Sequence, residues 1–329
     1  SDLFDIDPGA ATRLTFSDQP TTTTAGAGFT PTVKVTARDV VGNVATAFTG
    51  DITIAITGGT GTTGANLLGT KTIGALGGVA TFSDLAIDSA GSGYTLLASS
   101  GALTDATSNP FSINAGTATQ LTFTQQPTPT VSGEAIDPVV SVTARDGWGN
   151  VATTFVGDVA VSIASGTGTN GASLTGTTPV AAVGGVASFP DLVIDSAGTG
   201  YALRATSGTL TAATSTVFNV AAGAAKSLEF TVDPATTNAG QQIPTVQVTA
   251  RDSVGNVATG FTDNVFVAVT PLTGTANATL SGSKTVAAVS GVASFAGLSI
   301  DSAGTNYTLD ATSGTLAGAT STQFDINPC

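Results

Sequence analysis

The stretch Val35-Thr-Ala-Arg-Asp-Val-Val-Gly-Asn-Val-Ala-Thr46 decides the fold, because nearly the same letters return from Val142 and again from Val248. Three copies mean that the chain is one unit written three times, and repeats of this length fix the architecture before any other signal. In each copy apolar and polar residues alternate before a Gly-Asn turn, as in residues 33–38. The pattern predicts a half-buried antiparallel strand that enters a loop.

The other parts of a repeat predict six further short strands. In the first repeat we expect them near residues 14–16, 52–56, 71–76, 80–87, 94–98 and 111–113. Gly77-Gly78 is the expected two-residue hairpin turn, since primed turns need residues that tolerate a positive φ. A bulge near Ser83-Asp84 would turn the apolar residues on both sides of it to the core. Seven such strands per repeat, without helical periodicity, predict an all-β fold of three tandem immunoglobulin-like β-sandwich domains.

Aromatic residues repeat with the same regularity. Most of the 15 phenylalanines recur in each copy, and Tyr94, Tyr201 and Tyr307 each open the sixth strand shortly after an aspartate. This placement resembles the tyrosine corner of immunoglobulin-like sandwiches, in which the hydroxyl group bonds to nearby backbone. We therefore expect the phenylalanines to form the cores and the three tyrosines to be structural.

The repeats also set the expected domain boundaries. We place an extra N-terminal strand at 1–9 and the three domains at 10–115, 116–222 and 223–329. The extra strand, Phe4-Asp5-Ile6-Asp7-Pro8, is repeated almost unchanged as Phe324-Asp325-Ile326-Asn327-Pro328. Three sets of the other strands therefore accompany four copies of the last one. Because the links between repeats are short, we expect a semi-rigid rod.

Composition limits the possible partners. The 329 residues hold 22 acidic and 9 basic side chains, a net charge of −13. Nucleic acid and anionic membrane surfaces would repel such a chain, and no apolar run of about 18 residues could cross a membrane. Methionine is absent even from position 1, so we expect that an upstream targeting peptide is removed and that the protein is secreted or held at the cell surface.

The full repeat resembles a known group of proteins. Its pattern, VTARDxxGNVAT followed by LxGT and GGVATFxDLxIDSAGxGYTL, is similar to the bacterial Ig-like repeats of secreted and surface-anchored proteins, including invasin-type and intimin-type stalks. The resemblance covers the whole chain three times. It implies tandem domains in adhesins and surface fibres, and it implies no catalytic residues.

The inventory of side chains is poor in catalytic groups. The chain has no histidine, its single cysteine is the last residue, Cys329, and its glutamates are Glu134 and Glu229. The usual bases and nucleophiles are missing, so we expect no enzyme activity and no cofactor. Cys329 is either a free thiol or a point of intermolecular attachment.

The repeated acids Asp39, Asp146 and Asp252 are weak candidates for calcium ligands. Calcium takes six to eight oxygen ligands, and one acid per turn supplies few of them. The alternative is that each aspartate stabilises its own turn by accepting hydrogen bonds from backbone amides.

Positions at which the repeats differ are candidates for contacts. Trp148 replaces Val41 and Val254 in the loop after the second strand. We expect it at the junction of domains 1 and 2, facing residues 87–93, with an external partner as the alternative. Phe266 takes an outward phase and, with Arg204, marks a possible contact between subunits. Asn277 and Asn306 begin glycosylation sequons.

These observations lead to a structural role as the functional hypothesis. We expect a subunit of an extracellular fibre that assembles head-to-tail with copies of itself, with the N-terminal segment pairing to the C-terminal domain of the next copy. The assembly candidates are Phe4, Ile6, Phe324, Ile326, Trp148 and Phe266. Two alternatives remain open: a rigid stalk segment of a larger adhesin that meets cell-surface or matrix components, and a carbohydrate-binding accessory module.

Overall fold

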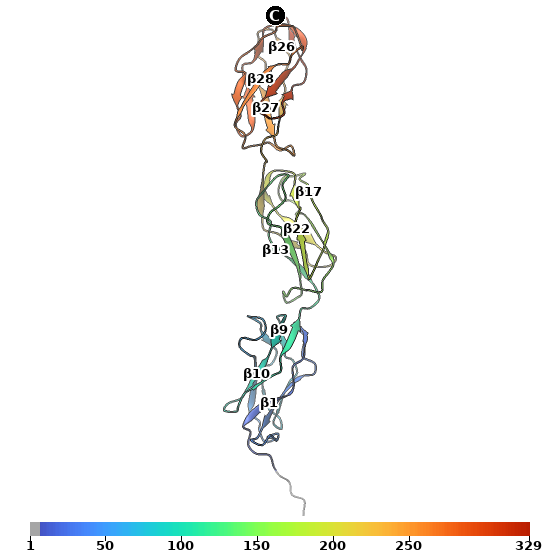
Figure 1. Ribbon diagram of the computed structural model, residues 1–329, viewed down its shortest axis with the longest axis vertical. Coiled ribbons are helices and arrows are strands. Elements are labelled where there is room, and N and C mark those ends of the chain that lie inside the picture. The colour runs from blue at the N-terminus through green and yellow to red at the C-terminus, as the bar shows by residue number, and fades with distance from the viewer. Residues whose placement is uncertain (1–6) are drawn as a thin grey trace, which may run out of the picture.

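The computed structural model of the chain describes residues 7–329. These residues form β-strands and no helix, and no helix able to cross a membrane occurs in this part of the chain. Figure 1 shows three β-rich domains arranged end to end, so that the molecule is a long rod with the C-terminus at one extreme. The predicted all-β fold of tandem immunoglobulin-like sandwiches is confirmed.

Each domain has the same series of short strands. Those of domain 1 are β1 (Arg13–Asp18), β2 (Thr23–Thr24), β3 (Val33–Arg38), β4 (Asp51–Ile56), β5 (Leu67–Leu68), β6 (Thr72–Gly74), β7 (Val79–Phe82), β8 (Ala86–Ile87), β9 (Gly91–Tyr94), β10 (Leu96–Ser99), β11 (Ala106–Thr107) and β12 (Phe111–Asn114). Those of domain 2 are β13 (Gln120–Gln125), β14 (Thr130–Val131), β15 (Val140–Arg145), β16 (Asp158–Ile163), β17 (Leu174–Thr175), β18 (Val180–Ala181), β19 (Val186–Phe189), β20 (Val193–Ile194), β21 (Gly198–Tyr201), β22 (Leu203–Thr206), β23 (Ala213–Thr214) and β24 (Phe218–Ala221). Those of domain 3 are β25 (Ser227–Val232), β26 (Thr237–Asn238), β27 (Val246–Arg251), β28 (Asn264–Val269), β29 (Leu280–Ser281), β30 (Thr285–Ala287), β31 (Val292–Phe295), β32 (Ser299–Ile300), β33 (Gly304–Tyr307), β34 (Leu309–Thr312), β35 (Ala319–Thr320) and β36 (Phe324–Asn327).

The strands of a domain divide among small sheets that face one another. In domain 1 the orders are β1-β3-β7, β11-β10-β4-β6, β2-β12-β9 and β5-β8, and the other two domains repeat them. Most neighbours are antiparallel, but β2 pairs with the last strand, β12, in parallel, with Ile113 opposite Thr23. In each domain a strand near the start of the repeat therefore lies beside the last strand and runs in the same direction.

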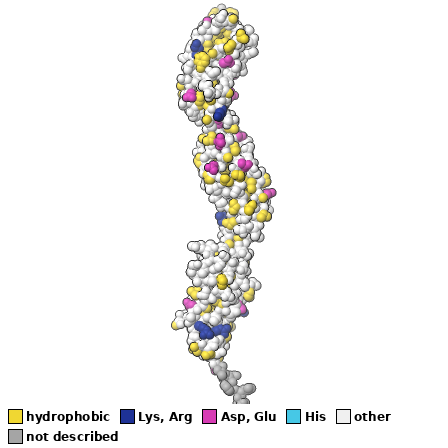
Figure 2. Space-filling model, viewed as in Figure 1, with side chains coloured by type: hydrophobic (Ala, Val, Ile, Leu, Met, Phe, Trp, Pro, Cys, Tyr) yellow, Lys and Arg dark blue, Asp and Glu magenta, His cyan; other side chains and the backbone are white. Residues whose placement is uncertain are grey.

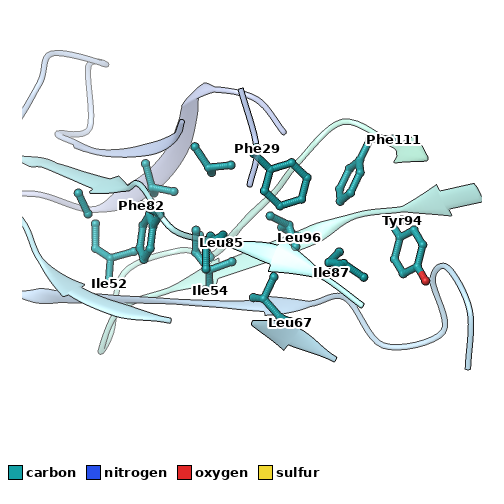
Figure 3. Packing of buried hydrophobic residues seen from close by; sticks show 14 of the residues in the cluster. Phe29, Ile52, Ile54, Leu67, Phe82, Leu85, Ile87, Tyr94, Leu96 and Phe111 are labelled. Atoms are coloured by element: carbon teal, nitrogen blue, oxygen red, sulfur yellow. The ribbon is translucent and has the colours of Figure 1, made fainter. Parts of the chain in front are cut away.

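The core lies between these sheets. In domain 1 it contains Phe82, Ile54, Leu96 and Tyr94, all nearly inaccessible to solvent (Figure 3). Phe29 meets Phe111 edge to face, with ring centroids 5.3 Å apart. The hydrophobic clusters of domains 2 and 3 draw on equivalent residues of their own repeats. Each domain thus buries its own core.

The prediction of a bulge at Ser83-Asp84 is wrong, because the chain crosses to another sheet at this point. The strand before it, β7, pairs with β3, whereas the strand after it, β8, pairs with β5 in a different sheet. Phe82 and Ile87 are both buried, as expected, because the chain changes sheet between them rather than bulging within one. The change of sheet reverses which alternate residues face inward, and this explains the shift of the apolar pattern.

The predicted hairpin turns are confirmed. Gly77 and Gly78 have φ values of 59° and 80°, and Leu76 bridges to Val79 around them. A side chain at Gly78 would place its Cβ 2.6 Å from the Ala45 carbonyl oxygen, so this position needs glycine for space as well as for conformation.

Charge is sparse on the surface of the rod. Figure 2 shows few acidic and basic side chains on a largely uncharged face. Within residues 7–329 the ion pairs are Lys34 with Asp18 at 2.8 Å and Arg251 with Glu229 at 2.6 Å. Exposed pairs of this kind contribute little to stability, so packing and backbone hydrogen bonds hold the domains together.

Candidate functional site

The loop after the second long strand of each domain is built around its buried aspartate. In domain 1 the Oδ1 atom of Asp39 accepts hydrogen bonds from the amides of Val41, Gly42 and Asn43 at 2.8–3.0 Å. Its Oδ2 atom accepts from the amide of Gly9 at 3.0 Å. One carboxylate therefore shapes the loop and fastens the peptide that enters the domain.

The same arrangement recurs in the other two domains. The linker amide of Gly116 donates to Asp146 at 2.8 Å, and that of Gly223 donates to Asp252 at 2.9 Å. The short links predicted from the sequence are thus fixed at their far ends by the loop that follows the second long strand of the next domain. We call the three segments 39–43, 146–150 and 252–256 the junction loops.

Burial opposes ionisation of these aspartates, but the hydrogen bonds that they accept outweigh it and lower the pKa of Asp39 and Asp146. For Asp252 burial also opposes ionisation, while Ser132, Gly223 and Asn256 donate to the carboxylate and lower its pKa to about 2. Amide hydrogens occupy the positions that a cation would need. No cluster of three or more possible metal ligands exists in the described part of the chain.

An asparagine in each junction loop reaches the preceding domain. The Nδ2 atom of Asn150 donates to the carbonyl of Asp88 at 2.9 Å, and its Oδ1 atom accepts from the amide of Ala90 at 2.8 Å. Asn256 repeats both contacts, with Asp195 at 2.8 Å and with Ala197 at 3.0 Å. A side-chain amide offers donors and an acceptor, so each asparagine bridges two domains through two hydrogen bonds.

A second contact in each junction is apolar. The indole of Trp148 lies against Gly26, at a distance that leaves no room for a side chain there. In the next junction Val254 occupies the equivalent place, with its Cγ1 atom 3.0 Å from where a Cβ on Gly133 would lie. Trp148 therefore lies at the junction of domains 1 and 2, as expected. Its ring contacts Gly26, however, and it is Asn150 that contacts the segment 87–93.

Differences between the two junctions are small but definite. The Oγ atom of Ser132 donates to Asp252 at 2.7 Å, which adds a bond between domains 2 and 3. Domain 1 has Ala25 at the equivalent position, so the first junction lacks this bond. Trp148 is 54% exposed and Val254 is 44% exposed, so both apolar contacts remain partly open to solvent.

The repeated arginines support the junction loops from behind. Arg38 donates to the carbonyl of Gly42 at 2.9 Å and to Thr15 on the neighbouring strand at 2.9 Å. Arg251 similarly holds Gly255, and pairs across the sheet face with Glu229 at 2.6 Å. These guanidinium groups are engaged in positioning the loops.

The tyrosines shape the surface that receives the next junction loop. The hydroxyl of Tyr94 donates to the carbonyl of Ser89 at 2.8 Å, and those of Tyr201 and Tyr307 make the same bond in their domains. Ser89 lies between Asp88 and Ala90, the two residues that Asn150 contacts. Each tyrosine, fully buried, thus holds in place a stretch of backbone that binds the following domain.

The other assembly candidates are not brought together. Phe324 and Ile326 are 4% and 2% exposed in the core of their own domain, where β36 lies between β26 and β33. Phe4 and Ile6 lie outside the described residues. Phe266 is 43% exposed on β28 of domain 3, whereas Arg204 lies on β22 of domain 2.

Three further residues lie at exposed positions of the last domain. Cys329 is an exposed free thiol, and its Sγ atom donates to the carbonyl of Ala239 at 2.9 Å. The sequon residues Asn277 and Asn306 have positive φ values of 64° and 60°. Both are exposed, Asn277 in a turn and Asn306 on β33. Of the residues named here, sequence reasoning missed the asparagines of the junction loops, although Gly-Asn is present in every repeat.

Comparison with known proteins adds little beyond the fold. No family model matches the chain, and no curated protein matches it. Solved structures with similar folds include the Yersinia pseudotuberculosis adhesin InvE, with 19% identity, a TM-score of 0.25, and coverage of 63% of this chain and 58% of that one. Extracellular domains 3–5 of Drosophila OTK match 98% of this chain and 100% of that one, with 15% identity and a TM-score of 0.25.

A β-glycosidase from Bacteroides vulgatus has a TM-score of 0.29 and 15% identity, over 64% of this chain and 25% of the enzyme. The chain thus spans about a quarter of that enzyme and just over half of the adhesin. Likenesses this distant bear only on the fold and carry no argument about activity. The geometry of the junctions must carry the functional argument.

Proposed function

We propose that this protein is a structural subunit of an extracellular fibre, in which copies join head-to-tail into longer rods. The observation that carries the proposal is that both internal junctions use one set of contacts, made by the junction loop of one domain and the tyrosine-held backbone of the domain before it. An interface that already joins two pairs of domains within the chain could join further copies in the same way. Contacts of this heterologous kind give open fibres when they do not close into a ring.

Strand exchange is the form of strand addition that this proposal requires. Phe324 and Ile326 already fill the last-strand place of domain 3, so an incoming strand cannot simply enter an empty groove. The N-terminal sequence Phe4-Asp5-Ile6-Asp7-Pro8 has the same apolar spacing as β36. We propose that it replaces β36 of the preceding copy, with Phe4 and Ile6 taking the buried positions.

The role proposed is mechanical rather than catalytic. The aspartates that could have served a reaction or a calcium ion are engaged by amides of their own loops. We propose that the fibre works outside the cell, with copies of itself as partners and cell-surface or matrix components at its ends. No cofactor is required for such a role.

Electron microscopy of the purified chain tests the proposal. We compare the intact protein with a variant that lacks residues 1–8 and with the double variant Phe4→Asp and Ile6→Asp. Long fibres from the intact protein, and single rods from both variants, are expected. Single rods from all three would reject the fibre.

The second candidate is a stalk segment that holds a binding domain away from a surface. The rod shape favours it equally (Figure 1), and it predicts single rods at every concentration. The third candidate, a carbohydrate-binding module, would use exposed aromatic rows. The exposed aromatic residues within 7–329 are Trp148 and Phe266, on different domains, which is a weak basis for stacking on a sugar chain.

A further inference from the structure

Within residues 7–329, the junction loop of domain 1 contacts no other domain. In domain 1 Val41 is 78% exposed, while its counterparts Trp148 and Val254 lie against glycines of a preceding domain. Asn43 is exposed, and its contact within residues 7–329 is with Asp39 of the same loop. Within the described residues, Asn43 therefore makes neither of the two interdomain hydrogen bonds that Asn150 and Asn256 make.

The C-terminal end of the rod carries the complementary surface. Gly240 has a φ of 72°, close to the 75° and 79° of Gly26 and Gly133. Among residues 7–329, nothing lies within 4 Å of where a Cβ on Gly240 would be, whereas Trp148 and Val254 cover the other two glycines.

The backbone that would receive an asparagine is also in place at this end. Tyr307 donates to the carbonyl of Ser302 at 2.9 Å, as Tyr94 and Tyr201 do to Ser89 and Ser196. Within the described part of the chain, the amide of Ala303 and the carbonyl of Asp301 have no hydrogen-bond partner of the kind that Asn150 and Asn256 supply. Domain 3 therefore presents the same glycine, backbone carbonyl and backbone amide that bind the junction loop of the next domain at the two internal junctions.

We propose that these two end faces bind each other between copies: Val41 of a second copy lies on Gly240, and its Asn43 bridges the Asp301 carbonyl and the Ala303 amide. The inference rests on the proposed fibre and names the surface by which copies recognise each other. Ala239 stands where Ser132 bonds to the next domain, so the contact between copies matches the first internal junction, which has Ala25 there.

The exchange of strands follows from the correspondence of residues between the repeats. Gly9 corresponds in the repeat to Gly116, Gly223 and Cys329, and its amide is bonded to Asp39 at 3.0 Å. Suppose that a second copy docks onto the first in the way that one domain docks onto the preceding domain within the chain. Its residues 4–8 would then come to the place of residues 324–328 of the first copy. Docking and strand exchange support each other, because the exchanged strand would connect the copies as β12 connects domains 1 and 2.

The end faces alone should bind weakly. The internal junctions form between tethered domains, and this raises their effective concentration far above that of free copies. Asn43→Ala removes two hydrogen bonds, and we expect association about tenfold weaker as a result. Val41→Asp places a charge against Gly240 and should leave single rods.

Sedimentation velocity and electron microscopy of the full chain test the inference. The matched control is Val183→Asp, which adds the same charge at a position that is 81% exposed on domain 2. We expect the wild type and this control to associate end to end, Asn43→Ala to associate about tenfold more weakly, and Val41→Asp to remain single. Equal association of all four would keep the fibre and overturn the end-face contact.

A tandem chain separates the two proposals if wild-type copies stay single, an outcome that rejects the fibre. In the tandem, residues 8–329 of a second copy follow Asn327 directly, so the link matches residues 114–116. Val41→Trp in the second copy should then be less accessible to acrylamide quenching than the same substitution in one copy alone, because the ring covers Gly240 as Trp148 covers Gly26. Equal quenching would overturn the complementarity of the end faces.

Discussion

Asp252 is the residue at which protonation and the union of two domains are directly coupled. Burial opposes its ionisation, but the hydrogen bonds from Ser132, Gly223 and Asn256 lower its pKa to about 2, against about 3.9 in an unfolded chain. A lowered folded-state pKa contributes stability that is present above the unfolded value and is lost as the pH falls through the folded one. We expect the second junction to weaken between about pH 4 and pH 2.

The Ser132→Ala variant tests this coupling. Loss of one charge-assisted donor should raise the pKa of Asp252 and move the loss of stability to higher pH. The carboxyl carbon of Asp252, followed by NMR through a pH titration, reports the change. Asp146, which has no such donor because of Ala25, is the internal control, and an unmoved Asp252 titration would contradict the assignment.

Tyr94 joins the core of domain 1 to the surface that binds domain 2. Tyr94→Phe keeps the ring but leaves the Ser89 carbonyl without its 2.8 Å donor, and we expect domain 1 to lose about 1–2 kcal/mol of unfolding free energy. Urea unfolding measures the loss, and Tyr201→Phe should reproduce it in domain 2. A neutral substitution in both domains would mean that water replaces the hydroxyl at no cost.

At the scale of elements, the hairpin of domain 3 departs from its two equivalents. Ser290 holds a φ of 49°, where domains 1 and 2 have Gly77 and Gly184 at 59° and 58°. Ser290→Gly should relieve this left-handed conformation and raise the unfolding free energy of domain 3 by about 0.5–1 kcal/mol. Thermal unfolding measures it. The adjacent Gly291→Ala is the reverse control, since its Cβ would lie 2.7 Å from the Ala258 carbonyl oxygen and should destabilise.

The elements also show what the sequence could and could not predict. Alternation and turn chemistry are local signals, so the long strand 33–38, the hairpin at Gly77-Gly78 and the inward phase of Phe82 and Ile87 were all predictable. The change of sheet between β7 and β8 was not, because a bulge and a crossing both reverse the phase of alternation. Only the partners, β3 and β5, tell them apart.

The candidate site was predictable only in part for a similar reason. Repetition singled out Asp39 and Trp148, but the role of Asn150 depends on the backbone of another domain, the amide of Ala90 and the carbonyl of Asp88. A repeated Gly-Asn reads as an ordinary turn when only one domain is considered. Contacts between repeats need the spatial order of the domains.

At the scale of the whole molecule, the two junctions should differ in stiffness. Asn150→Ala removes both side-chain hydrogen bonds of the first junction, whereas Asn256→Ala leaves the bond of Ser132 to Asp252 in the second. We expect a broader distribution of angles between domains 1 and 2 in the first variant than between domains 2 and 3 in the second. Angles measured on electron micrographs of single rods decide this, and equal broadening would contradict it.

The parallel pairing of β2 with β12 has a consequence for a rod that is pulled. Tension enters each domain near its first strands and leaves through its last one, so it slides the backbone of Thr23 past that of Ile113 instead of peeling the two apart. Hydrogen bonds loaded in shear must break together. An atomic force microscope that pulls on the two ends should therefore record three separate rupture peaks, one for each domain. Each peak should be followed by an increase in contour length of about 30–40 nm, the length of one unfolded domain. Such a rod would resist drag until a threshold, and then lengthen.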